Sequence, residues 1–186
     1  KLVHVPYKGG GQAMADALTI LEHGDLRRDE LCYVGDGNNM CHSLLNLAGC
    51  LGMRMVVCTP KGYEPDAGIL ASASRLATHN GGQIRLVAEP LSAVKGASFV
   101  YTDVWASMGQ EAEAEERQEV FRPFQVNAEL LAAAPAHAKI LHCLPAHRGE
   151  EITADVFESE RAIVFDQAEN RLHAQKAILE RLISGA

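Results

Sequence analysis

Two short motifs in this 186-residue chain carry side chains that could do chemistry. His142-Cys143-Leu144-Pro145 follows the apolar run 138–141, and Asp103 begins a second motif about forty residues earlier, which runs on to Gly109. A thiol, an imidazole and a carboxylate therefore lie at the ends of two apolar segments. If both segments are strands of one parallel sheet, their carboxyl ends meet at the edge where such sheets bind ligands. The spacing predicts a binding crevice or active site there.

Each of these residues also has an ordinary structural explanation. Asp103 could be a simple turn residue, and Cys143 could be a small buried hydrophobe. His142, Cys143 and His147 together could suggest a metal, but no fourth ligand has suitable spacing, so we expect no metal. A cysteine nucleophile activated by histidine, as in a hydrolase, stays open as an alternative.

A third polar segment, Gly35 to Met40, follows another apolar run and opens a helix. It superficially resembles a dinucleotide-binding fingerprint. However, Met40 stands where the third glycine should be, and the next strand ends in Cys58-Thr59 where a ribose-binding acid should stand. We therefore expect no NAD. Asn38 and Asn39 could face a ligand or merely cap the helix.

Two further segments could bind anions. Arg171 lies at an expected helix start after the last expected strand, where a guanidinium can hold a carbonyl or phosphate oxygen. The alternative is a surface arginine paired with an acid. The glycines at 9–11, just before Gln12, fit a flexible linker better than a phosphate loop, because no Lys-Ser or Lys-Thr follows them.

Short apolar runs alternate with amphipathic stretches along the whole chain. The runs are continuous, as in strands buried on both faces; the expected strands are 31–34, 54–58, 84–87, 98–101, 140–142 and 162–165. The expected helices are 12–23, 39–51, 67–79, 110–120, 127–134 and 169–183. This order predicts an α/β fold with a doubly wound, Rossmann-like parallel sheet in three αβα layers. We expect one domain at 12–186 after a leader or linker at 1–11.

Composition excludes several classes of partner. The net charge is −7, and no run of basic residues exceeds Arg27-Arg28, so nucleic acid is not expected as a partner. No apolar stretch is long enough to cross a membrane. The five cysteines form an odd set without a Cys-x-x-Cys pair, which favours a reducing, cytoplasmic location.

Taken together, the motifs resemble those of the ornithine carbamoyltransferases. The resemblance covers roughly residues 12–183 and is carried by Gly35-Asp36-Gly37-Asn38-Asn39, Thr59-Pro60-Lys61-Gly62-Tyr63, Asp103-Val104-Trp105-Ala106-Ser107-Met108-Gly109, His142-Cys143-Leu144-Pro145 and Glu169-Asn170-Arg171. It implies carbamoyl transfer from carbamoyl phosphate to the δ-amine of ornithine, which gives citrulline and phosphate in arginine biosynthesis. It implies no cofactor.

The resemblance also implies roles for individual residues. The α-groups of the amino acid would be held by Asn39, Asp103, Ser107 and Met108. Cys143 and Asp103 would orient the attacking amine. Leu144, through its carbonyl, and Gln12 would contact the carbamoyl group, and Arg171 would stabilise the developing oxyanion.

The chain also departs from that family. Its members carry a preceding domain with a Ser-x-Arg-Thr phosphate loop, which this sequence lacks, and a His-Pro-x-Gln motif of which only Gln12 remains. Residues 1–10 instead weakly resemble a segment of tricarboxylate-type solute-binding proteins. We therefore expect a truncated or chimeric chain with negligible activity alone, which would use carbamoyl phosphate only if the missing domain were supplied. The alternative is a non-catalytic scaffold with no ligand.

Apolar stripes on two expected helices predict self-association. Met14, Leu18 and Leu21 lie on one helix, and the stripe Leu172 to Ile183 lies on the other. Water-exposed apolar patches favour contact between copies. We expect a homodimer or larger species.

Overall fold

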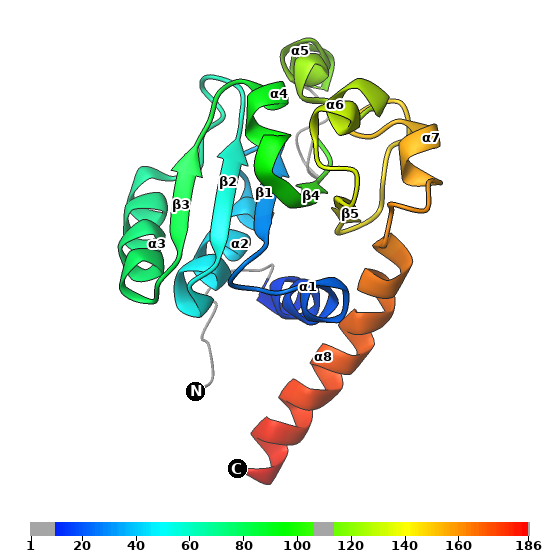
Figure 1. Ribbon diagram of the computed structural model, residues 1–186. Coiled ribbons are helices and arrows are strands. Elements are labelled where there is room, and N and C mark those ends of the chain that lie inside the picture. The colour runs from blue at the N-terminus through cyan, green and yellow to red at the C-terminus, as the bar shows by residue number, and fades with distance from the viewer. Residues whose placement is uncertain (1–9, 106–113, 186) are drawn as a thin grey trace.

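The computed structural model describes residues 10–105 and 114–185. Within them lies a five-stranded parallel sheet in the order β3-β2-β1-β4-β5 (Figure 1). The strands are β1 (Glu30–Val34), β2 (Arg54–Cys58), β3 (Gln83–Leu86), β4 (Ala97–Thr102) and β5 (Lys139–His142). The predicted α/β doubly wound architecture is confirmed.

Helices cover both faces of this sheet. They are α1 (Gly10–His23), α2 (Asn39–Leu51), α3 (Ala67–His79), α4 (Pro90–Ala93), α5 (Ala114–Phe121), α6 (Ala128–Ala133), α7 (Ala154–Phe157) and α8 (Val164–Ser184), with short 3₁₀ turns η1 (Val94–Gly96) and η3 (Arg122–Phe124). Side-chain caps begin three of the helices, because the oxygens of Asn38, Asp66 and Asn127 accept backbone N–H groups of α2, α3 and α6.

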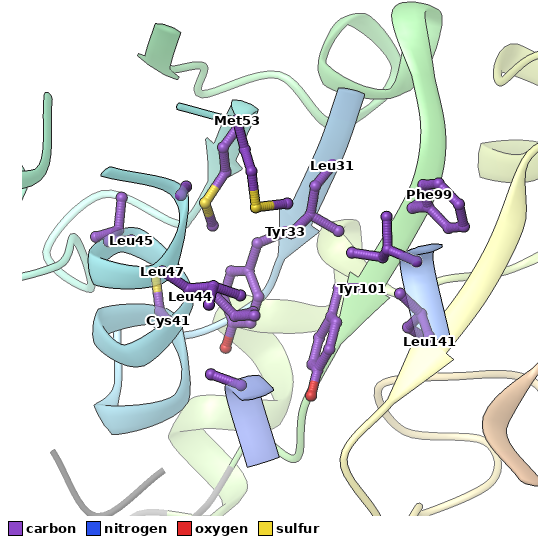
Figure 2. Packing of buried hydrophobic residues seen from close by; sticks show 14 of the residues in the cluster. Leu31, Tyr33, Cys41, Leu44, Leu45, Leu47, Met53, Phe99, Tyr101 and Leu141 are labelled. Atoms are coloured by element: carbon purple, nitrogen blue, oxygen red, sulfur yellow. The ribbon is translucent and has the colours of Figure 1, made fainter. Parts of the chain in front are cut away.

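Alternate residues of the strands feed two separate cores. Tyr33, Phe99, Tyr101 and Leu141 point to the face covered by α1 and α2, where they pack with leucines of α2 (Figure 2). The strand residues that alternate with these four point to the opposite face of the sheet, which α4, α6 and α7 cover. A strand buried on both faces reads as one continuous apolar run, as seen in the sequence.

The prediction of a strand at residues 162–165 is wrong. Ala162 makes only an isolated bridge to Ile140, and α8 begins at Val164 rather than at residue 169. The run Ala162-Ile163-Val164-Phe165 is rich in β-branched and aromatic residues, but a short apolar run fits a strand and a buried helix start equally well. Here Ile163 and Val164 are buried while Phe165 is exposed, as at the start of an amphipathic helix.

The other boundaries differ by little. α1 begins at Gly10, two residues before the predicted start, and two short helices, α4 and α7, were not predicted. Residues 1–9, like Ser107 and Met108, lie outside the described residues. None of the described helices is long and apolar enough to cross a membrane.

Candidate active site

The candidate site lies where the order of the strands reverses. From β1 the chain winds outward through β2 to β3, and then returns to place β4 on the other side of β1. Open α/β sheets bind ligands outside the carboxyl ends of the strands at such a point. Asn38 follows β1, Asp103 follows β4 and Cys143 follows β5.

Asp103 and Cys143 are in direct contact. The Cys143 thiol donates a hydrogen bond to Asp103 Oδ1 at 2.8 Å, and the backbone N–H of Val104 donates to the same oxygen at 2.8 Å. Asn38 Nδ2 donates to Asp103 Oδ2, also at 2.8 Å. Asp103 is only 9% exposed, so the carboxylate is held from both sides in one orientation.

The environment of Cys143 keeps its thiol protonated. Burial raises the pKa of the Cys143 thiol well above its usual range, and the negative charges of Asp103 and Asp16 raise it further. A protonated thiol is a hydrogen-bond donor and a poor nucleophile. This geometry fits a residue that orients a ligand and counts against the cysteine-hydrolase alternative.

His142 is occupied by structural hydrogen bonds. Its Nδ1 accepts from the backbone N–H of Leu144 at 2.9 Å, so the proton of the neutral ring is on Nε2, which donates to Glu151 Oε1 at 3.0 Å. Both ring nitrogens of this buried histidine therefore have partners other than Cys143, which counts against a role as the base for that thiol. Leu144 has a φ of 58°, a backbone conformation that non-glycine residues rarely adopt and that is common at functional loops.

A second group of predicted residues surrounds a buried carboxyl group, Asp16. Gln12 Nε2 donates to Asp16 Oδ1 at 2.7 Å, and Gln167 Nε2 donates to the same oxygen at 2.7 Å. Tyr101 donates its hydroxyl to Oδ2 at 3.1 Å. Arg171 lies two turns into α8, rather than at its start, and is exposed. Its positive charge acts to lower the pKa of Asp16.

Burial raises the pKa of Asp16 to about 7, although hydrogen bonds from Gln167, Gln12 and Tyr101 oppose the rise. Because the charge of Asp16 also raises the pKa of the Cys143 thiol, the two groups belong to one electrostatic neighbourhood. Asn39, the exposed first residue of α2, stands beside the cap residue Asn38. Ser107 and Met108, the other predicted binding residues, lie outside the described residues.

Sequence reasoning missed several residues that shape the site. Asp16 and Gln167 are one example, and a second is the buried Arg117, which forms an ion pair with Asp36 and donates from Nε to the Trp105 carbonyl at 2.6 Å. Arg117 also lies over the Tyr63 ring, 4.9 Å from its centroid. One signal was present: Asp16 occupies a position among small and apolar residues of α1, where an acid is unusual.

Comparison with known proteins identifies the family. A sequence model described as the Asp/Orn-binding domain of aspartate/ornithine carbamoyltransferase matches residues 28–182. The chain belongs to this carbamoyltransferase family. Among curated proteins, the ornithine carbamoyltransferase of Pyrococcus horikoshii is 54% identical to this chain over 175 residues. These residues are 94% of this chain and 55% of that protein.

Solved structures of the same family agree. Ornithine carbamoyltransferase from Pyrococcus furiosus is 54% identical with a TM-score of 0.88, and the match covers 92% of this chain and 55% of that one. The enzyme from Gloeobacter violaceus is 47% identical with a TM-score of 0.84, and the match covers 91% and 57%. This chain thus spans about half the length of the relatives that it matches.

Proposed function

We propose that this domain is the ornithine-binding half of an ornithine carbamoyltransferase. The observation that carries the proposal is the hydrogen-bonded pair of Asp103 and Cys143 at the switch point of the sheet. The relatives about 54% identical to this chain are ornithine carbamoyltransferases, which favours ornithine over aspartate as the amino acid.

The two ends of ornithine suit different parts of the candidate site. Asn39 opens α2, and the N-terminus of a helix favours a carboxylate. Asp103 supplies the negative charge that an ammonium group needs, and Ser107 and Met108 would complete this part of the site. Cys143, with Asp103, would direct the δ-amine toward the carbonyl of carbamoyl phosphate, because an amine attacks only when its lone pair is held against the carbon.

The second substrate would meet the group around Asp16. Gln12 is held by Asp16, and we propose that its amide and the Leu144 carbonyl contact the carbamoyl group. Arg171, which is exposed and close to Asp16, would meet the developing negative charge. No metal or organic cofactor enters this scheme.

Catalysis needs more positive charge than this scheme supplies. Carbamoyl phosphate is an anion, and the Ser-x-Arg-Thr loop expected to bind its phosphate does not occur in these residues. We therefore expect negligible turnover from this chain by itself and restored turnover only with a carbamoyl-phosphate domain. We place the reaction in cytoplasmic arginine biosynthesis, with self-association of the domain and without nucleic-acid or membrane partners.

Calorimetry with ornithine and with norvaline, an analogue without the δ-amine, tests the proposal. Both amino acids should bind, and Asp103→Ala should weaken ornithine binding at least tenfold. Glu129→Ala, which removes an exposed acid from α6, is the matched control and should leave binding unchanged. If neither amino acid binds to the folded wild-type protein, the alternative of a non-catalytic scaffold is favoured.

A further inference from the structure

A tight turn after the Cys143 motif brings three potential metal ligands together. The backbone N–H of Glu150 donates to the His147 carbonyl at 3.0 Å, and Gly149 supplies the positive φ, 94°, that this turn needs. The turn places His147 Nδ1 3.5 Å from Glu150 Oε2. Glu151 follows directly, and one ligand atom from each of the three residues lies within 4.8 Å of the others.

Glu151 is the buried member of this cluster and lacks a full set of partners. Its side chain is fully buried, and Oε1 accepts from His142 Nε2 at 3.0 Å and from the His147 backbone N–H at 2.6 Å. Oε2 has no hydrogen-bond partner within the described parts of the chain. A buried carboxylate oxygen without a partner is costly, and a cation would satisfy it.

We propose that His147, Glu150 and Glu151 form a site for a divalent transition-metal cation such as zinc or manganese. An imidazole with two carboxylates suits these ions better than calcium or magnesium, which prefer oxygen ligands alone. Ligand atoms about 2.0–2.2 Å from a tetrahedral zinc ion lie about 3.5 Å from each other. The His147–Glu150 separation of 3.5 Å already has this value, and the ligand atoms of all three residues lie within 4.8 Å of one another.

A surface cleft adjoins this site at Glu150. Glu150 also lines a surface cleft of about 410 Å³ together with Glu115, Glu119 and one base, Arg122. The acids outnumber the base among the lining residues, so the local potential favours cations. This cation site shares only His147 with the set His142, Cys143 and His147 considered above, and it does not use the thiol or carboxylate of the candidate active site.

Calorimetric titration with zinc chloride and with manganese chloride tests the proposal on the complete chain. One ion should bind per chain, and His147→Ala and Glu150→Gln should each weaken binding at least tenfold. Both side chains are partly exposed, so the variants should fold, which circular dichroism checks. His137→Ala removes another exposed histidine and should have no effect.

Cys143→Ser separates this site from metal capture by the Cys143 thiol. Binding that persists in Cys143→Ser and is lost in His147→Ala supports the proposal. Binding lost in Cys143→Ser but kept in His147→Ala would assign the ion to the candidate active site and overturn it, as would the absence of binding to the wild-type protein. Because no step depends on ornithine, failure here leaves the proposed function unaffected.

Discussion

At the scale of single residues, the Cys143 thiol is the most informative group, because its charge state separates a positioning role from a nucleophilic one. Burial and Asp103 both raise the pKa of this thiol. Iodoacetamide at pH 8 should therefore alkylate Cys143 more slowly than Cys50, which is less buried, as measured by peptide mass spectrometry.

Asp103→Asn should accelerate alkylation of Cys143 because it removes the nearby negative charge, and it should leave the rate at Cys50 unchanged. Rapid alkylation of Cys143 in the wild-type protein would contradict the protonated, hydrogen-bonded thiol and revive the hydrolase alternative.

Asp16 predicts a dependence of stability on pH. Its pKa is about 7 in the folded protein and near 3.8 in the unfolded chain. Between about pH 3.8 and pH 7, Asp16 holds a proton in the folded protein that it has released in the unfolded chain. Raising the pH through this range therefore lowers the free energy of unfolding. Asp16→Asn removes this penalty, and its stabilising effect relative to wild type should grow by up to about 3 kcal/mol between pH 5 and pH 8. Urea unfolding at several pH values measures it; a difference that stays constant with pH would refute the assignment.

At the scale of elements, the start of α2 links stability to the site. The side chain of Asn38 accepts from the N–H groups of Met40 and Cys41 and donates to Asp103, whereas the neighbouring Asn39 is exposed. Asn38→Ala should lower the free energy of unfolding by about 1–2 kcal/mol, the usual cost of a lost cap. Asn39→Ala should cost less than about 0.5 kcal/mol yet weaken ornithine binding. Equal losses of stability in urea titrations would contradict this division.

Local signals explain which elements were predicted well. The bounds of α2 and α3 were predicted to the residue, because Asn38 and Asp66 are residue types that cap helix N-termini and so mark where the two helices begin. The proximity of Asp103 and Cys143 followed from the rule that parallel strands end at one edge. In contrast, Gln167 meets Asp16 across 151 positions, and no local pattern encodes such a pair. The helix start at Val164 was hidden by β-branched residues, whose strand preference tertiary packing overrides.

At the scale of the whole molecule, the contacts of α8 within the described residues anchor its first half. There Asn170 donates to Thr19 and Glu22 of α1, while the rest of the helix projects from the body (Figure 1). Leu172, Leu179, Leu182 and Ile183 are 53–84% exposed. An apolar stripe of this kind is stabilised when another surface covers it, and a second copy presents the same stripe.

We therefore expect light scattering after size-exclusion chromatography to show a dimer or larger species at micromolar concentrations. Leu179→Glu should shift the protein toward monomer, because a charge within the stripe would have to lose its water in the contact. Ala177→Glu adds the same charge at an exposed position of α8 outside the stripe and should leave the assembly intact. A wild-type protein that stays monomeric throughout this range would show that the exposed half of α8 does not hold two copies together.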